Sequence, residues 1–394
     1  MSLGRFLSGV IASARREVGR ITSNREYRSV VVWLPLGVIL FFALFFSQEV
    51  VGALPVAVVD EDNSQLSRRL VSMFYATHEI ADVREVADMA EARAQLLSGD
   101  VVGVVEISDG FARNLLSGVT TDVVYYDSGT NISTSSLSSK GVQTAVTSFG
   151  VGVALKRAEI GGATPDEAMA QAMPIGFTTY GLFNPWLNYA YYVGPCFWAM
   201  ILIIAAMLST IYAVGSELRY GTVVEWLRSA NGSLVAGVIG KLAPTTVAMW
   251  LLVVVTGGLI FALFGAPMRG SWAMLTVGIM VLILAYQAVA LSIVAMTASF
   301  RLSLSLGGGY SVLAFTFSGV TFPTMAMIQW VQPITKLFPY TYFMELYIDQ
   351  AVRGVAWWYS MPKVAVMLLF CLLPLLACSR LKKVLVNRRY WWRL

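Results

Sequence analysis

Six long stretches of the sequence carry no charged residue and are dominated by apolar side chains. A helix needs roughly 20 apolar residues to cross a bilayer, and each stretch is long enough. The predicted membrane spans lie near residues 30–50, 190–213, 242–264, 272–297, 304–325 and 363–379. Only 13% of the residues are charged, whereas an ordinary soluble protein carries about 25%. The sequence therefore predicts an α-helical membrane protein with six transmembrane spans.

Basic residues flank both ends of the chain. Residues 1–28 contain six arginines, and the tail 380–394 contains six lysines and arginines. Lys and Arg beside a span are retained on the cytoplasmic side of the membrane. Both termini are therefore expected in the cytoplasm, which agrees with an even number of spans and places the segment after the first span, 29–52, outside.

Residues 53–188 form a predicted α/β domain inserted between spans 1 and 2, outside the cytoplasm. This segment holds sixteen acidic and eight basic residues, a balance of −8, so the rest of a chain of net charge +5 carries +13. This separation of negative and positive charge along the chain follows the predicted membrane topology. The net positive charge therefore gives no support to nucleic-acid binding.

Strand-like and helical patterns alternate within this domain. Predicted strands at 55–60, 101–106 and 122–127 alternate with predicted helices at 64–77, 89–98 and 109–116. A long helix over 134–160 and a closing strand over 174–183 follow, and the order as a whole indicates an α/β fold. The acidic run Asp60-Glu61-Asp62 lacks the alternating ligands of a calcium loop and is interpreted as a solvated turn.

The N-terminal segment 1–28 has apolar residues at helical spacing opposite a basic face. Two interpretations remain open. The segment is either an amphipathic helix in the inner membrane interface or a cytoplasmic helix packed on protein.

The usual catalytic constellations are missing from the sequence. His78 is the single histidine, so His-based metal sites and Ser-His-Asp triads are excluded. The nearest match to a phosphate-binding loop, Gly237 to Lys241, has the wrong spacing. The chain is therefore not expected to be an enzyme or to hold a metal or cofactor.

A short charged segment, 216–230, joins spans 2 and 3 on the cytoplasmic side. Wound as one helix, it has an apolar face and a polar face. The apolar face contains Tyr220, Val223, Val224 and Leu227, and the polar face contains Glu217, Gly221, Glu225 and Arg228. The segment is either a handle that a partner grips or a cap on the bundle in which Arg228 neutralises Glu225.

The string Glu217-Leu-Arg-Tyr-Gly-Thr222-Val-Val-Glu225-Trp-Leu227 resembles the coupling-helix signature of ABC-2 type permeases, the membrane subunits of type V ABC exporters. Leu54 to Asp60, followed by Ser64, is similar to the start of the extracytoplasmic domain in one subgroup of that family. Ser318 to Pro323 and Phe338 to Tyr342 are similar to the family's fifth span and broken external helices. One departure is Ala230-Asn231-Gly232, where many members have a proline.

The resemblance implies a bundle 189–379 that contains a coupling helix, 216–230, and broken external helices, 322–361. It implies two permeases, identical or paired with a homologue, and two separate ATPase subunits that bind ATP and Mg. The residues it assigns to coupling are Glu217, Arg219, Gly221, Thr222, Glu225 and Leu227. Those it assigns to an outer gate are Gly319, Phe322, Pro323, Pro333, Phe338, Pro339 and Tyr342, for which tight packing of irregular backbone is the alternative.

Two charges lie near membrane depth. A charged side chain is energetically costly inside the membrane, so Lys241 and Glu345 are functional candidates. For Lys241 there is a commoner explanation, in which the side chain snorkels to the inner interface.

The expected function is export of a hydrophobic or lipid-like substrate across a bacterial cytoplasmic membrane, in contact with membrane lipid. In a cell with two membranes the external domain is placed to meet a periplasmic adaptor and an outer-membrane channel. The alternative is a membrane-anchored receptor or envelope scaffold that acts through its external domain without transport. Ion-driven secondary transport is disfavoured because the spans hold almost no acidic residues.

Overall fold

The computed structural model describes residues 2–45, 52–173, 182–183, 191, 193–264 and 268–391. Contacts divide the chain into two compact units, one of Val50–Trp186 and one of Met1–Glu49 with Leu187–Leu394. The first is the α/β unit and the second is the helical unit. Part of the predicted closing strand, 174–181, lies outside the described residues, as do residues 46–50 of the first predicted span.

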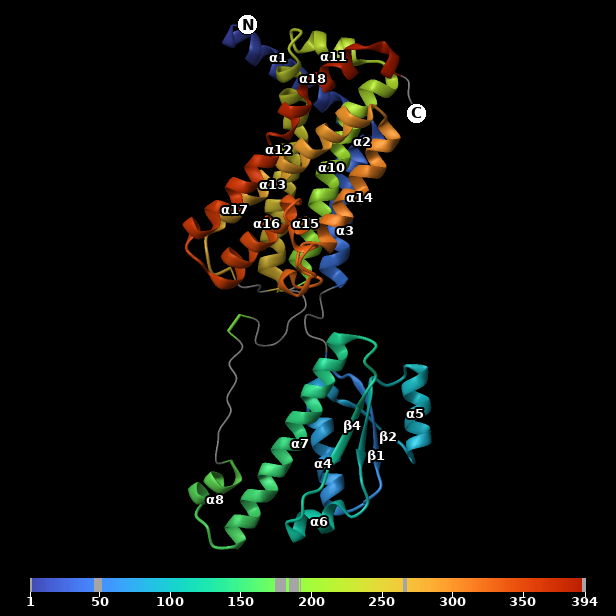
Figure 1. The fold of residues 1–394 in the computed structure, drawn as a ribbon, viewed down its shortest axis with the longest axis vertical. Coiled ribbons are helices and arrows are strands. Elements are labelled where there is room, and N and C mark those ends of the chain that lie inside the picture. The colour runs from blue at the N-terminus through green and yellow to red at the C-terminus, as the bar shows by residue number, and fades with distance from the viewer. Residues whose placement is uncertain are drawn as a thin grey trace. The chain divides into compact units, whose positions relative to one another are not determined.

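A mixed four-stranded sheet organises the α/β unit (Figure 1). Its strands are β1 (Pro55–Asp60), β2 (Asp82–Glu85), β3 (Gly103–Ile107) and β4 (Val123–Asp127). The order is β2-β1-β3-β4, with β1 parallel to β2 and β3, and β4 antiparallel to β3. The helices are α4 (Gln65–Ala76), α5 (Met89–Ser98), α6 (Phe111–Ser117), α7 (Ile132–Ile160) and α8 (Pro165–Ala172), with a short turn η2 (His78–Ile80).

Helices cover both faces of this sheet, which explains why its central strands are nearly continuous runs of valine. Val58 and Val105 point into a core shared with α4 and α7, and the next residues along β1, Ala57 and Val59, face α5 instead. The predicted α/β organisation is confirmed. The sequence missed β2, because only Val83 of its four residues is buried.

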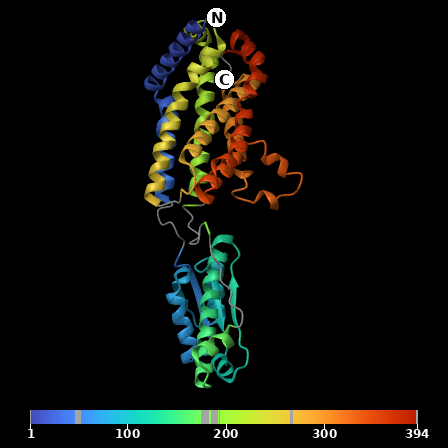
Figure 2. The same ribbon diagram turned by 90° about the vertical axis from the view of Figure 1, so that its left-hand side faces the viewer.

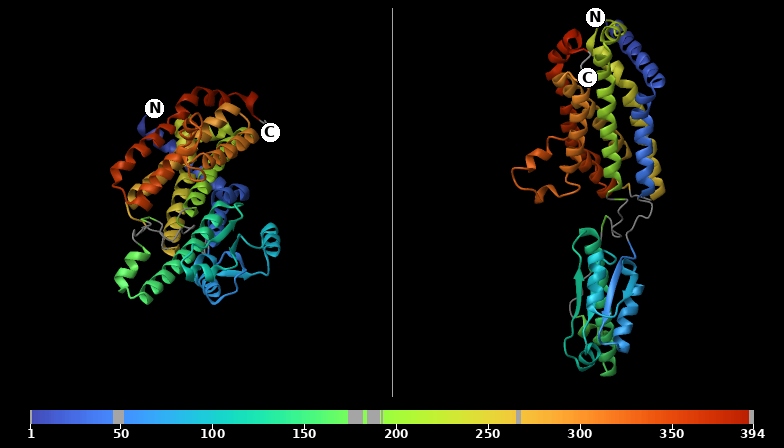
Figure 3. Two further views of the ribbon diagram at one scale, coloured as in Figure 1. Left: turned by 60° about the horizontal axis from the view of Figure 1, so that its bottom comes forward. Right: turned by 90° about the vertical axis from the view of Figure 1, so that its right-hand side faces the viewer.

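The helical unit is a bundle built around α10 (Gly194–Tyr220) and α13 (Trp272–Thr297) (Figures 1 and 3). The other elements before the outer loops are α1 (Leu3–Ser23), α2 (Arg25–Arg28), η1 (Ser29–Trp33), α3 (Leu34–Phe45), α11 (Val223–Ser229), α12 (Leu234–Phe264) and α14 (Phe300–Thr316). The remaining elements are η3 (Thr324–Ala326), α15 (Gln332–Thr335), α16 (Pro339–Tyr347), η4 (Ile348–Arg353), α17 (Trp357–Phe370), α18 (Leu373–Val386) and η5 (Arg388–Tyr390).

Five helical segments of the described chain are long and apolar enough to cross a membrane. They are Arg25–Phe45, Gly194–Tyr220, Leu234–Gly258, Trp272–Thr297 and Trp357–Val386. The predicted span at 304–325 is not confirmed as a sixth, because α14 has 17 residues and ends at Thr316. At 1.5 Å per residue such a helix is about 25 Å long, short of a hydrocarbon core of about 30 Å. The chain turns soon afterwards at Gly319, where φ is +85°.

Candidate functional site

A sharp corner joins α10 to α11, and the single helix predicted over 216–230 is wrong. Gly221 has φ +68° and its N–H closes the last turn of α10 on the carbonyl of Glu217. The Thr222 N–H donates to the same carbonyl, at 3.0 Å. A left-handed glycine after the last turn ends a helix, so Glu217 belongs to α10 and Glu225 to α11, and the two do not share one helical face.

The short helix α11 is anchored by its buried face. Val223 and Trp226 are fully buried, and the Trp226 indole N–H donates to the Ser13 hydroxyl at 3.1 Å and the Gly237 carbonyl at 3.3 Å. On the other side Glu225 and Arg228 are exposed, and the structure gives no ion pair between these two described residues. The apolar face predicted from the sequence did not include Trp226. Its spacing of three residues from Val223 would have placed both side chains on the buried side of a helix. The side of α11 that carries Glu225 and Arg228 is thus exposed.

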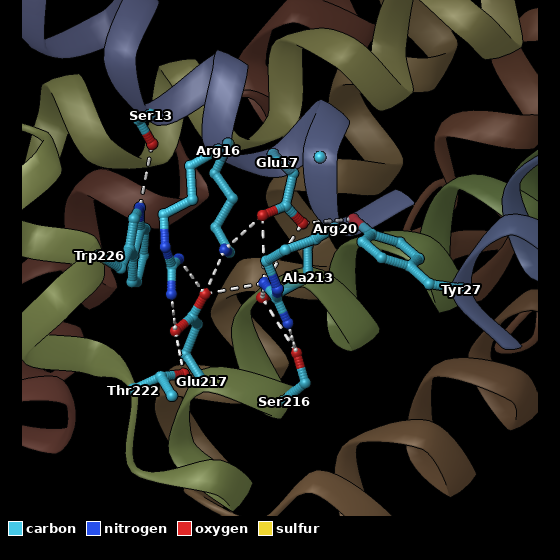
Figure 4. Close-up of polar contacts among 12 residues, drawn as sticks. Ser13, Arg16, Glu17, Arg20, Tyr27, Ala213, Ser216, Glu217, Thr222 and Trp226 are labelled. Carbon is cyan, nitrogen blue, oxygen red and sulfur yellow. Dashed lines mark hydrogen bonds and ion pairs between the residues drawn. The ribbon is translucent and has the colours of Figure 1, made fainter. Parts of the chain in front are cut away.

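Glu217 is fully buried and faces the interior of the helical unit (Figure 4). Its Oε1 accepts from Arg16 at 2.5 Å, Arg20 at 2.7 Å and Lys241 at 2.7 Å. Its Oε2 accepts from Arg16 at 3.2 Å and from the Thr222 hydroxyl. The predicted coupling residues Glu217 and Thr222 therefore bond to each other across the corner, and Glu217 does not reach an external partner.

A second carboxylate, that of Glu17 on α1, completes this arrangement. It is fully buried and accepts from Lys241 at 2.6 Å, Arg20 at 3.1 Å and the Tyr27 hydroxyl at 2.7 Å. We call Arg16, Glu17, Arg20, Glu217 and Lys241 the buried charge cluster; it holds three cations and two carboxylates.

Lys241 on α12 lies at the centre of the cluster. Its side chain is fully buried, and its ammonium lies 4.8 Å from the centre of the Trp226 ring as well as between the two carboxylates. Snorkelling to the membrane interface is therefore the wrong explanation for this residue. Buried charges are tolerated only when they are paired and hydrogen-bonded, so the cluster ties α1, α10 and α12 into one set of contacts.

Helix α1 approaches the bundle through small residues and runs obliquely to the spans (Figures 2 and 3). A Cβ added at Gly240 of α12 would lie 2.3 Å from the Val10 carbonyl oxygen, and one at Gly9 would lie 2.8 Å from that of Ala230. The face of α1 that packs on the bundle contains Gly9, Ser13 and Glu17, so the two predicted placements of its apolar face, in the membrane interface or on protein, both stay predictions. Its apolar residues Leu3, Leu7, Ile11 and Val18 are exposed.

Gly240→Ala is expected to lower the free energy of unfolding of the helical unit by about 1–3 kcal/mol, the usual cost of overpacking. The added methyl group would push α1 away from α12 and separate Glu17 from Lys241. Gly258→Ala in the same helix is the matched control, because nothing lies within 4 Å of its added Cβ. Thermal unfolding of both variants in mild detergent measures the difference, and equal melting temperatures would contradict the close approach.

The other two predicted coupling residues lie beside the corner. Arg219 is half-buried, and its guanidinium lies over the rings of Tyr220 at 5.5 Å and Phe300 at 5.6 Å. Leu227 is half-buried on α11. Neither side chain belongs to the buried charge cluster.

The predicted outer-gate residues do not form one group. Phe322, Pro323 and Pro333 are exposed in the loop that carries η3 and α15, which projects from the side of the bundle (Figure 2). Phe338 and Pro339 are buried at the start of α16. Tyr342 is half-buried, with its hydroxyl 3.3 Å from the Lys336 carbonyl. Gly319 lies at a tight turn, where an added Cβ would lie 2.8 Å from Thr324.

Glu345 is exposed on α16, and the buried carboxylate of this region is that of Asp349. Asp349 pairs with Lys363 of α17 and lies 3.7 Å from Arg353. The neighbouring Gln350 accepts from the Ser271 N–H at 3.0 Å and donates to Ser360 at 2.8 Å. Sequence reasoning missed this contact, which joins η4 to α17 and to the start of α13.

No group of three or more His, Cys, Asp or Glu side chains suited to a metal ion occurs among the described residues. In the acidic turn after β1, the Asp60 carboxylate accepts from the backbone of Asp62 and Asn63 and from the Ser67 hydroxyl. Asp62 accepts from the Ala112 N–H at 3.1 Å. These carboxylates therefore hold the turn that leads into α4.

Comparison with known proteins gives two results. The family model described as "ABC-2 family transporter protein" matches residues 25–379. The chain is also 21% identical over 347 residues to "Probable multidrug ABC transporter permease YbhR" of Escherichia coli strain K12, covering 87% of this chain and 90% of the relative. The protein of the same name from Escherichia coli O157:H7 matches to the same extent.

Proposed function

Because the chain belongs to the ABC-2 family of transporter proteins, we propose that it is the membrane-spanning permease subunit of an ATP-driven exporter. Two such permeases, identical or paired with a homologue, assemble with two ATPase subunits that bind ATP and Mg. The chain crosses the bacterial cytoplasmic membrane six times, with α14 as the fifth span and both termini inside. In cells with two membranes the α/β unit faces the periplasm, where an adaptor and an outer-membrane channel complete the path.

One observation carries this proposal, namely that α11 is exposed on one side and tied to the bundle on the other. Glu225 and Arg228 present the exposed side. The buried side is held by Trp226, and the Thr222 hydroxyl bonds to Glu217 at the end of α10. A push by an ATPase on α11 is therefore transmitted to α10 directly, and to α1 and α12 through the buried charge cluster.

Hydrophobic small molecules or lipids are the proposed substrates. The relatives are named as probable multidrug permeases, and the outer segment carries exposed Met325, Ile328 and Trp330, which suit apolar cargo or lipid. The turn at Gly319 and the buried start of α16 at Phe338 are the proposed fixed parts of the outer gate.

Glu225→Arg is expected to abolish ATP-dependent efflux while the protein still inserts and folds. The glutamate is exposed, so reversing its charge disturbs the contact with the ATPase and leaves the bundle intact. Efflux of a panel of fluorescent hydrophobic dyes and fluorescent phospholipids is measured in vesicles that contain the permease and its ATPase. Glu159→Arg, on the exposed surface of α7, is the charge-matched control. If efflux by Glu225→Arg is undiminished, α11 does not couple the ATPase to transport.

The alternative function has its own test. A wild-type chain that purifies in mild detergent with no ATPase would favour a membrane-anchored receptor or scaffold.

A further inference from the structure

An apolar groove of about 400 Å³ lies between α11 and the segment that follows α18, at the end of the bundle where α1 begins and α18 ends (Figure 1). One wall comes from α11 and the residues after it, and the other comes from the end of α18 and the tail. The lining residues are Val223, Val224, Leu227, Arg228, Gly232, Leu385, Val386 and Trp391. We call it the tail groove.

The tail wall is held in place by specific contacts. The Trp391 indole is nearly buried, and its N–H donates to the Leu385 carbonyl at 3.0 Å. The Arg388 guanidinium lies 5.8 Å from the centre of the same ring. Asn387 ends α18, and its side chain accepts from the Arg389 N–H at 3.0 Å. The chain therefore folds back on itself after Val386 and sets the indole as a wall of the groove.

The tail groove carries basic residues. Arg228 is one of its lining residues, and the Arg388 guanidinium lies over the Trp391 ring that forms one wall. Lys382, Lys383 and Arg389 are exposed on the same segment of the chain as that wall. The sequence contains no Asp or Glu after Asp349. Complementary surfaces pair opposite charges around an apolar centre, so the occupant that fits is an apolar side chain flanked by carboxylates.

The position of the groove favours one occupant. Val223, Val224 and Leu227 belong to α11, and the exposed Glu225 of the same helix is the residue on which the proposed coupling rests. A partner that grips α11 from outside the bundle must therefore lie beside the tail groove.

We propose that the tail groove is the second half of the ATPase docking surface, and that it receives an apolar side chain from an acidic segment of the ATPase. The inference rests on the proposed function and extends it, because it assigns partner binding to the tail as well as to α11. In this arrangement Val386 and Trp391 contribute affinity, while Glu225 and the buried charge cluster transmit movement.

Photo-cross-linking in the intact permease–ATPase complex tests the location. A photoreactive phenylalanine analogue at Val386, an exposed position in the groove, is expected to cross-link to the ATPase. The same analogue at Leu376 is the control, since this exposed residue lies on α18 outside the groove. Cross-links from position 386 to lipid, or only to residues of the same chain, would overturn the proposal.

Charge variants at Val386 test the chemistry. Val386→Glu is expected to lower the amount of ATPase that co-purifies by tenfold or more, because a carboxylate repels an acidic segment. Val386→Lys is expected to retain more ATPase than Val386→Glu, and Val386→Leu should match the wild type. Equal losses for Glu and Lys would refute an acidic partner. Suppose that Glu225→Arg lowers dye efflux, but that position 386 neither cross-links to the ATPase nor alters the amount of ATPase that co-purifies. The proposal for the tail groove then fails, and the proposed function stands. If the wild-type chain purifies with no ATPase at all, the proposed function itself fails.

Discussion

Lys241→Met is expected to lower the free energy of unfolding of the helical unit by about 3–5 kcal/mol, the cost of removing one partner from a buried ion pair. The methionine has a similar length but no charge, so Glu17 and Glu217 would remain buried without the ammonium that lies 2.6 and 2.7 Å from them. Arg16 and Arg20 still reach these carboxylates but are partly exposed. The melting temperature in mild detergent should therefore fall clearly.

Two further variants make this result specific. Lys336→Met removes an exposed lysine and should leave the melting temperature almost unchanged. The double variant Lys241→Met with Glu17→Gln restores the charge balance and should be less destabilised than the sum of the single variants, because residues in contact couple. Additive losses would show that Lys241 and Glu17 do not stabilise each other, and a Lys241→Met protein as stable as the wild type would show that the cluster contributes little to the fold.

The sequence predicted those elements whose signals are local. β1 and β3 are recognisable from their valine runs, and α4 from the serine before it, whose side chain accepts from the Ser67 N–H in the structure. Apolar length located five of the six predicted spans among the described residues. These features depend on neighbouring residues, and composition and periodicity record them directly.

The buried charge cluster could not be predicted in the same way. Glu17 and Lys241 are 224 positions apart in the chain, and Arg16 and Glu217 are 201 apart. Charge counts assigned the N-terminal arginines to membrane topology, and nothing local indicated that two of them bind a carboxylate at the end of α10. The same limit applies to Asp349 and Lys363, which come from different helices.

The corner at Gly221 lies between these cases. The glycine at position 221 is a recognised sequence signal for the end of a helix. The apolar periodicity of 216–230 as a whole nevertheless predicted one continuous helix. The correction changes the role of each acidic residue. Glu225 stays on the outer surface, whereas Glu217 becomes an internal contact that bonds to the Thr222 hydroxyl just before α11.

Glu217→Gln is accordingly expected to reduce ATP-driven efflux by tenfold or more, while the ATPase stays bound and continues to hydrolyse ATP. Among the described members of the cluster, Glu217 alone bonds to α1, to α12 and to Thr222 at the start of α11. A glutamine is neutral, and its NH2 group cannot accept at the oxygen position it replaces. At the Oε1 position it would lose the bonds from Arg16, Arg20 and Lys241, and at the Oε2 position those from Arg16 and the Thr222 hydroxyl. Movement of α11 would then no longer be transmitted to α1 and α12 through the buried charge cluster.

Efflux, ATP hydrolysis and the amount of folded complex must be measured on the same vesicles, because Glu217→Gln also weakens a buried pair. Thr222→Val removes only the hydroxyl bond to Glu217 and should reduce efflux in the same direction by a smaller factor, with little change in melting temperature. If efflux by the glutamine variant falls only in proportion to the folded protein, Glu217 is purely structural. In that case the movement of α11 must pass through the buried face of Trp226, whose indole N–H bonds to Ser13 of α1 and to the Gly237 carbonyl of α12.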